Sequence, residues 1–361
     1  MVNKKILIGI IAIIAIVAVI GGVYFVTQTQ NLTQSQNSIH IDAGYITMSA
    51  GHALIFIAKE KGYFADEGLD VNVLEFTTAN DELNALASDK IDVAVAGIGE
   101  PLIQMDNGRN YTFIGGVDNG DHAIIAKNES ISENLRSNPE NYKKYKIGTV
   151  SGIPAEIIIL GYLKENANID KNDLEIVEFK TAPDVVNGIK SGKVDVGLVY
   201  PAFQYSAEKE GLSIVNFTDE LMPSLPDCRI AINAKDVNNQ TERQWINYTK
   251  ALIKAYDFYK TNHNETLDIV KKYVPIEGDE LEISTYNDHL VLNTDPNEKG
   301  TIKFYDVLEE IGYVDGNVNV ADHFNLIIYK TALDEILKEE PNNQNYLFLK
   351  GLFENQNPQT S

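Results

Sequence analysis

The chain has 361 residues, of which 44% are hydrophobic and 23% are charged, a balance typical of globular domains with real cores. Lys and Arg number 30 against 52 Asp and Glu, so the formal net charge is −22, and no basic stripe that would neutralise phosphates is present. This argues against nucleic-acid binding. The single cysteine, Cys228, excludes an intramolecular disulfide and a structural zinc site built from thiolates. We therefore expect neither a metal nor a cofactor.

The N-terminus carries a membrane signal. Lys4 and Lys5 precede an uncharged apolar run over residues 6–26, which as a helix is about 31 Å long and matches a hydrocarbon core of about 30 Å. The two lysines place the N-terminus inside and the remainder outside the cytoplasm. We expect residues 1–26 to be a single-pass membrane anchor, with a cleaved export signal as the alternative. The polar, uncharged residues 27–38 are predicted to be a flexible linker.

The next segment contains an internal repeat. Residues 75–97, EFTTANDELNALASDKIDVAVAG, align without gaps on residues 178–200, EFKTAPDVVNGIKSGKVDVGLVY, and ten of the 23 paired positions are identical. The offset of 103 residues is far too long for a solenoid. It indicates two similar lobes that are built on the same supersecondary unit.

Each copy of the repeat predicts a strand, a helix and a second strand. Residues 70–76 alternate and are rich in valine, residues 78–81 offer helix N-caps, and residues 91–97 form a short apolar run that ends in glycine. A strand, helix and strand of this length form a right-handed crossover in a parallel sheet. The fold class is therefore predicted to be α/β.

The remaining elements extend this scheme to two lobes. Opening strands are expected at 40–46 and 146–150, strands from YTFIGGV and HAIIAK close the first lobe, and CRIAIN (228–233) returns the chain to it. Helices follow at 241–259, 265–273, 279–290, 301–311 and 320–338. The predicted organisation is lobe 1 at 39–127, lobe 2 at 128–228, a return to lobe 1 with C-terminal helices at 229–338, and a largely disordered tail at 339–361 in which YLFLKGLF could dock.

Ligands of open α/β sheets bind beyond the carboxyl ends of the strands. Four such loops are predicted, at residues 47–52, 97–101, 151–154 and 200–201, two from each lobe. They define a cleft that would close around a small polar solute by hinge motion.

Several side chains in or near these loops are candidate ligand contacts, each with a structural alternative. Ser49, Ser151 and Gly152 precede helices and suit an anion, although Ser and Gly are also ordinary caps. Glu100 would favour an amine or a ring nitrogen, and otherwise complements a helix dipole. His52 and His122 would donate hydrogen bonds to an anion, and the alternative is that they only stabilise the fold. Tyr45 and Tyr200 would stack on a planar ligand or pack in the core.

Residues 43–76, AGYITMSAGHALIFIAKEKGYFADEGLDVNVLEF, resemble the nitrate/sulfonate/taurine type (NMT1/THI5-like) of ABC-transporter substrate-binding protein. The matching features are Gly44-Tyr45, the segment AKEKGYF (58–64), EGLDV (67–71), IDVAVAG with Pro101, and SGKVDVGLVYP in the second lobe. The resemblance covers most of residues 39–235 and, more loosely, the C-terminal helices.

This resemblance implies a two-lobed, periplasmic-binding-protein-like (type II) receptor that works with a separate permease and ATPase. Its implied ligand contacts are Ser49, His52, Gly97, Ile98, Gly99, Glu100, Ser151, Gly152 and Tyr200. Ligands of the family include nitrate, bicarbonate, sulfonates, taurine and pyrimidines. The predicted loops lack the arginine of a typical oxyanion site, and Glu100 favours a cationic or ring-nitrogen group.

The predicted function is therefore an extracytoplasmic solute-binding protein of an ABC importer, monomeric and not an enzyme. One alternative is a ligand sensor that signals through a membrane partner. The other is a pyrimidine-biosynthesis enzyme, which shares this fold but would need a cofactor lysine and a cluster of cysteine and histidine ligands. The one cysteine and six scattered histidines of this sequence offer no such cluster.

Overall fold

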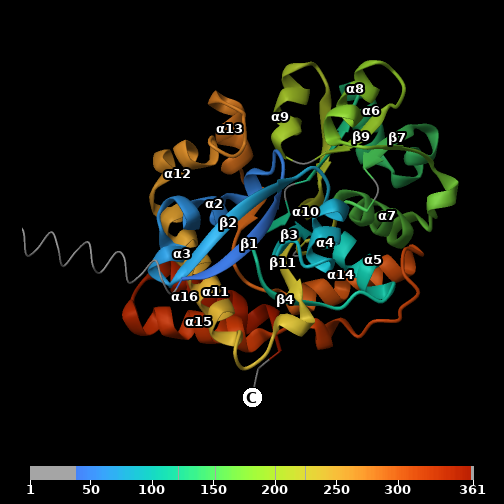
Figure 1. The fold of residues 1–361 in the computed structure, drawn as a ribbon. Helices are drawn as coiled ribbons and strands as arrows, with labels where there is room; N and C mark the ends of the chain where they lie inside the picture. The colour runs from blue at the N-terminus through green and yellow to red at the C-terminus, as the bar shows by residue number, and fades with distance from the viewer. Residues whose placement is uncertain (1–37, 121, 151, 200, 224, 359–361) are drawn as a thin grey trace, which may run out of the picture.

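The computed structural model describes residues 38–358, apart from positions 121, 151, 200 and 224. Two lobes, each with a sheet covered by helices on both faces, form an α/β architecture (Figure 1). The predicted two-lobed α/β fold is confirmed. The predicted anchor at residues 6–26 lies outside the described residues, and within them no helix is long and apolar enough to cross a membrane.

The first lobe is built on strands in the order β2-β1-β3-β11-β4, where a parallel bridge between Ala43 and Val93 joins β1 to β3. β1 and β2 are parallel, whereas β11 is antiparallel to β3 and β4. The strands are β1 (Ile39–Ile46), β2 (Leu69–Phe76), β3 (Ala94–Gly97), β4 (Tyr111–Gly116) and β11 (Cys228–Asn233).

Helices from both ends of the chain cover this sheet. One apolar core forms against α2 (Ala53–Glu60), α3 (Tyr63–Asp66), α11 (Glu242–Thr261), α12 (His263–Val270), α15 (Leu326–Glu339) and α16 (Gln344–Gln356). The other core forms against α4 (Ala79–Ala87), α5 (Gly99–Asp106) and α14 (Glu298–Glu310). The C-terminal helices are thus part of the first lobe, because their apolar sides complete its core (Figure 1).

The second lobe has the strand order β10-β6-β9-β7-β8. β7 is parallel to β8 and β9, and β6 is antiparallel to β9 and β10. The strands are β6 (Ala123–Ala126), β7 (Lys146–Val150), β8 (Glu175–Phe179), β9 (Val196–Val199) and β10 (Ser213–Phe217). Its helices are α6 (Glu129–Ser137), α7 (Pro154–Ala167), α8 (Ala182–Lys190) and α9 (Pro201–Lys209).

The predicted end of lobe 1 at residue 127 is wrong, because HAIIAK enters the second sheet as β6 and pairs with β9 and β10. The chain therefore crosses first through β5 (Asp118–Gly120) and returns through α10 (Thr218–Leu221) and the segment before β11. A bridge between Asn119 and Pro226 holds the two crossing segments side by side. The antiparallel strands β6 and β11 are the ones that the chain enters after each crossing.

The repeat is visible as equivalent contacts in both lobes. Thr78 and Thr181 cap α4 and α8, since their hydroxyls accept from the backbone N–H of Asp81 at 3.1 Å and of Asp184 at 3.4 Å. At the turn after each helix, Asp89 and Gly192 occupy equivalent positions with φ of 55° and 76°. This left-handed conformation suits glycine, and aspartate is among the few other residues that tolerate it.

Three C-terminal expectations are corrected. The tail is not largely disordered among the described residues: YLFLKGLF docks, as the sequence allowed, within α16, whose Tyr346 and Leu349 are buried against the first lobe. The helix expected at 279–290 ends early, as α13 (Gly278–Thr285), and is followed by β12 (Leu290–Leu292), which pairs with β5. The helix expected at 320–338 is a short 3-10 turn (Val320–His323) and then α15, because Asn325 caps a new helix by accepting from Ile328 N–H at 3.3 Å.

The lobes meet on two sides. Ile157 and Ile158 of α7 belong to the core that contains α5 and α14 of the first lobe. On the other side, Tyr205 of α9 donates a hydrogen bond to Asp279 of α13, 3.0 Å between oxygens. Figure 1 shows α9 and α13 facing each other across the top of the molecule. The space between these two contacts holds the candidate site.

Candidate functional site: the cavity between the lobes

A cavity of about 630 Å³ lies between the lobes. Both lobes line it with the turns that follow their parallel strands: residues 46–52, 77–81, 97 and 100 from the first lobe, and residues 150, 152–154 and 179–183, with Phe203, from the second. Its floor is formed by Asp118, His122 and Asp227, which lie on the two crossing segments, and by Cys228, the first residue of β11. The cavity therefore lies where the strand-end rule for open α/β sheets predicts a ligand.

Helix N-termini open onto this cavity from both lobes. α4 begins after Thr78 and α8 after Thr181, and both threonines line the cavity as equivalent members of the repeat. The unpaired N–H groups and the dipole of a helix favour an anionic or polar ligand group at such ends. The two copies of the repeat thus present the same polar turn from opposite walls.

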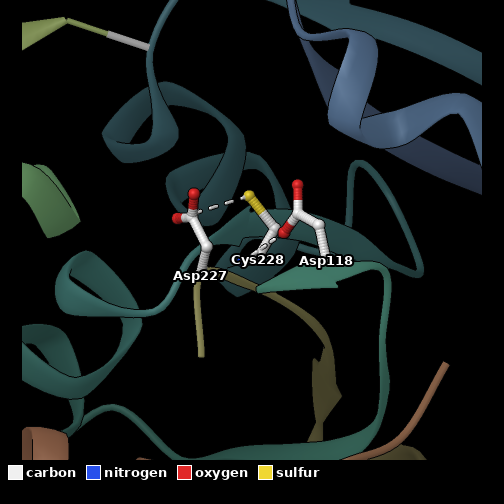
Figure 2. A group of neighbouring side chains, drawn as sticks. All are labelled: Asp118, Asp227 and Cys228. Carbon is white, nitrogen blue, oxygen red and sulfur yellow. Dashed lines mark hydrogen bonds between the residues drawn. The ribbon is translucent and has the colours of Figure 1, made fainter. Parts of the chain in front are cut away.

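The floor brings three possible metal ligands together (Figure 2). One ligand atom from each of Asp118, Asp227 and Cys228 lies within 4.8 Å of the others. The backbone N–H of Cys228 donates to Asp118 Oδ1 at 2.7 Å, and the thiol lies 3.9 Å from Asp227 Oδ1. All three side chains are at least nine-tenths buried. Carboxylates and a thiol are therefore concentrated at the hinge between the lobes.

Two histidines flank these groups. His122 Nδ1 lies 3.0 Å from Asp227 Oδ2, and both side chains are buried. His52 is fully buried, and its Nδ1 accepts a hydrogen bond from the Ile46 N–H at 3.2 Å. Burial lowers the pKa of His52 to about 4, although Asp227 opposes the shift, so the ring is neutral at physiological pH. Its proton is then on Nε2, which has no partner among the described residues.

The charge balance of the lining is acidic. Asp81, Glu100, Asp118 and Asp227 contribute carboxylates, whereas Lys180 is the one lysine, and arginine is absent, among the described lining residues. Arg229 lies beneath the floor, where its Nη1 donates to the carbonyl oxygens of Asp118 at 2.8 Å and Cys228 at 2.7 Å. Burial lowers its pKa, an effect that Asp118 and Asp295 oppose. This guanidinium offsets part of the negative charge and fixes the crossing segments.

Glu100 and Gly152 meet where the lobes approach each other. A Cβ atom on Gly152 would lie 3.1 Å from Glu100 Oε2, and Gly152 has a φ of 76°, so glycine is favoured on both counts. The Gly152 N–H donates to Glu156 Oε2 at 2.8 Å, while Tyr313 from the first lobe donates to Glu156 Oε1 at 2.5 Å. Glu156 therefore holds a cavity loop of one lobe and a side chain of the other.

The structure brings together six of the predicted contact residues in the cavity lining: Ser49, His52, Gly97, Glu100, His122 and Gly152. Ser151 and Tyr200 lie outside the described residues. Ile98 and Gly99 are not in the lining, since both are buried and Gly99 faces Ile157 and the Gly152 carbonyl. Tyr45 is a core residue, edge-on to Phe56 with ring centroids 5.0 Å apart, so its predicted stacking on a ligand is wrong.

Sequence reasoning missed two lining turns and most of the floor. The turns at 77–81 and 179–183 follow the repeated strands and line the cavity. The repeat itself was a usable signal, because each copy places the same threonine after a strand that ends in phenylalanine. Asp118, Asp227 and Cys228 gave no such signal: more than a hundred residues separate Asp118 from the other two, and the crossing segments carry no motif.

The fold and its interlobe cavity define a two-lobed, periplasmic-binding-protein-like protein. The model of the "NMT1/THI5 like" family matches residues 49–265, more than half of the chain, and the chain belongs to this family. The predicted family resemblance is confirmed.

Individual proteins are similar at low sequence identity. A putative binding protein of Brucella abortus is 23% identical over 256 residues, covering 70% of this chain and 76% of that protein. A formylaminopyrimidine-binding protein of Halalkalibacterium halodurans is 23% identical over 228 residues, covering 62% and 66% of the two chains. Among solved structures, the periplasmic nitrate-binding protein of Synechocystis superposes with a TM-score of 0.70 at 16% identity, covering 82% of this chain and 89% of that chain.

Proposed function

We propose that the protein is an extracytoplasmic solute-binding protein of an ABC importer that captures a small polar solute between its lobes. The observation that carries this proposal is the interlobe cavity, lined by equivalent turns of a repeated unit from both lobes. Binding proteins with this architecture close by hinge motion around a ligand. The binding-protein relatives and the nitrate-binding neighbour support the same role.

The partners and location follow from the same role. A separate permease and ATPase would accept the solute, and a monomer leaves both lobes able to move. Residues 6–26 would anchor the chain as a single span, with residues 27–38 as the tether between anchor and lobes. Candidate solutes are a sulfonate, nitrate, bicarbonate or a pyrimidine-like ring.

The acidic lining favours a solute that carries amino or ring-nitrogen donors over a bare oxyanion. Glu100 is half-buried at the lobe interface, and Gln104 fixes its carboxylate by donating to Oε1 at 3.1 Å. Phe179 and Phe203 add ring surface to the same cavity. A carboxylate beside apolar rings suits a planar, amino-substituted heterocycle.

The test is thermal unfolding of the full chain against nitrate, bicarbonate, taurine, an alkanesulfonate and aminopyrimidines. A solute with a Kd of about 1 μM, present at about 1 mM, should stabilise the protein by roughly 4 kcal/mol. Glu100→Gln should weaken an amino-substituted solute at least tenfold. The matched control is Glu133→Gln on the exterior of α6, which should leave the affinity unchanged. If unfolded and refolded protein responds to none of the panel, the proposal is contradicted and a sensor role becomes the better candidate.

A further inference from the structure

We propose that the floor of the cavity binds one divalent transition-metal ion of the zinc type through the Cys228 thiolate and the carboxylates of Asp118 and Asp227. The proposal goes beyond solute capture and is independent of which solute is bound. Metal binding is an exchange of ligands without oxidation or reduction: the Cys228 thiol releases its proton, and the thiolate and carboxylate oxygens displace water from the ion.

The three donors are already close. Their ligand atoms lie within 4.8 Å of one another, and Figure 2 shows both carboxylates and the sulfur rising from neighbouring backbone on the same side. Zinc holds its ligands at about 2.0–2.3 Å, so small side-chain rotations bring these atoms into one coordination shell. A single cysteine cannot build a multi-thiolate zinc site, but one thiolate with two carboxylates is a different donor set, assembled from two crossing segments.

A second observation points independently to an occupant. His52 is fully buried, lines the same cavity and carries its proton on Nε2, because Nδ1 accepts from the Ile46 N–H. The Nε2–H group has no acceptor among the described residues. A buried donor without a partner lowers the stability of the fold, so we expect a group with lone pairs to accept this hydrogen bond. A water or anion on the proposed ion would supply that acceptor.

The donor set selects the kind of ion. A thiolate with two carboxylates suits zinc and similar borderline ions, whereas calcium and magnesium prefer oxygen ligands alone. His122 lies behind the site with Nδ1 3.0 Å from Asp227 Oδ2, the kind of outer contact that orients a ligating carboxylate. Because Asp118 lies on one crossing segment, and Asp227 and Cys228 lie at the end of the other where it enters β11, the ion would connect both sides of the hinge.

The experiment uses the full chain, stripped with a chelator and titrated with Co²⁺ and Zn²⁺ in the absence of any organic solute. We expect one Co²⁺ per chain, a near-ultraviolet thiolate-to-cobalt charge-transfer band, and displacement of Co²⁺ by Zn²⁺. Cys228→Ser should abolish the band, and Asp227→Asn should weaken Co²⁺ binding at least tenfold. The matched control, Asp334→Asn on the exposed side of α15, should leave the band and the affinity unchanged.

Three outcomes would overturn the proposal: no Co²⁺ binding by the stripped wild type, binding without the thiolate band, or displacement of Co²⁺ by Ca²⁺ at equal affinity. Thermal unfolding of each variant shows whether it is folded. If Cys228→Ser does not fold, the loss of Co²⁺ affinity in Asp227→Asn still tests the proposal. The solute panel is measured on the stripped protein, so failure of the solute proposal and failure of the metal proposal are seen separately.

Discussion

His122 Nδ1 lies 3.0 Å from Asp227 Oδ2, a buried contact that joins the two segments through which the chain passes between its lobes. His122 immediately precedes β6, and Asp227 immediately precedes β11. These are the strands that the chain enters after each crossing, so the contact lies at the hinge. It is also at the floor of the cavity, where hinge geometry and ligand binding are necessarily coupled.

We expect His122 and Asp227 to be strongly coupled in stability. A double-mutant cycle with His122→Ala, Asp227→Ala and the double variant should give an interaction free energy of about 2 kcal/mol, because the contact is buried and removal of one partner leaves the other uncompensated. The measurement is urea unfolding of the four proteins at pH 7.

The control pair is His289 and Asp219, which lie 3.0 Å apart with side chains 26% and 35% exposed. Solvent screens this pair, so its interaction free energy should be below about 1 kcal/mol. Equal coupling in the two pairs would show that the hinge contact has no special role in stability.

Gly99→Ala should hold the lobes apart. A Cβ atom at this position would lie 2.4 Å from Ile157 Cδ1 and 2.7 Å from the carbonyl oxygen of Gly152, both in the second lobe. The backbone oxygen cannot move without displacing a cavity loop, and overpacking of this kind costs about 1–3 kcal/mol. Small-angle scattering should report a larger radius of gyration and solute titration a weaker affinity.

The control for this substitution is Gly351→Ala in α16, where a Cβ atom meets nothing within 4 Å. Replacing an unhindered helical glycine should leave the lobes in place and stabilise the protein by about 0.5–1 kcal/mol. If Gly99→Ala binds solute as tightly as Gly351→Ala, close approach of the lobes is not needed for binding.

The sheets of both lobes were predictable because local patterns specify them. β7 and β11 were predicted at their observed bounds, and β1 and β2 within one residue, since each alternates or is continuously apolar between turn signals. The assignment of β6 to a lobe was not predictable in this way. AIIA in a buried strand fits either sheet equally well, and only pairing with β9 and β10 decides between them.

The candidate site was likewise predictable only in part. Ser49, Gly97 and Gly152 were found because turns after parallel strands face the ligand in this kind of fold. Tyr45 was misplaced because a tyrosine at the end of a strand suits a core as well as a cleft, and Phe56 and Tyr273 enclose it. Asp118 and Asp227 come together through the crossing of two remote segments, which no local pattern encodes.

Glu156→Ala should loosen the cavity loop of the second lobe. Glu156 is buried and accepts from the Gly152 N–H at 2.8 Å and from the Tyr313 hydroxyl at 2.5 Å. Glu156 also pairs with Lys171, whose Nζ lies 3.3 Å from Oε1. Its removal leaves the buried Gly152 N–H, the half-buried Tyr313 hydroxyl and the Lys171 ammonium without this acceptor, so unfolding free energy should fall by about 2–4 kcal/mol. Tyr313→Phe removes the bond to Glu156 and the one that Lys171 donates to the Tyr313 hydroxyl at 2.6 Å, but it keeps the Gly152 contact, and it should cost about 1 kcal/mol, measured by urea unfolding. An equal loss in both variants would show that the Gly152 loop does not depend on Glu156.

Asp295 should give the protein a distinctive dependence of stability on pH. Its side chain is buried between the first lobe and the C-terminal helix, and burial raises its pKa to about 6, although Asn297, Asn357 and Arg229 stabilise the ionised form. An aspartate in the unfolded chain has a pKa of about 3.9. Between these two values the native state binds more protons than the unfolded state.

Unfolding free energy must therefore fall as pH rises from about 4 to about 6, by up to roughly 3 kcal/mol for this group, and level off above its folded pKa. Asp295→Asn cannot ionise, so the difference in unfolding free energy between variant and wild type should shift in favour of the variant across this window and then become constant. Urea unfolding at closely spaced pH values measures this difference directly.

The matched control is Asp334→Asn. Asp334 is exposed and its Oδ2 lies 2.7 Å from Lys330 Nζ, so the stability of this variant should follow that of the wild type across the same pH window. A difference for Asp295→Asn that stays flat from pH 4 to pH 7 would mean that Asp295 is already ionised in the native protein at pH 4, and that Arg229 and Asn357 outweigh its burial.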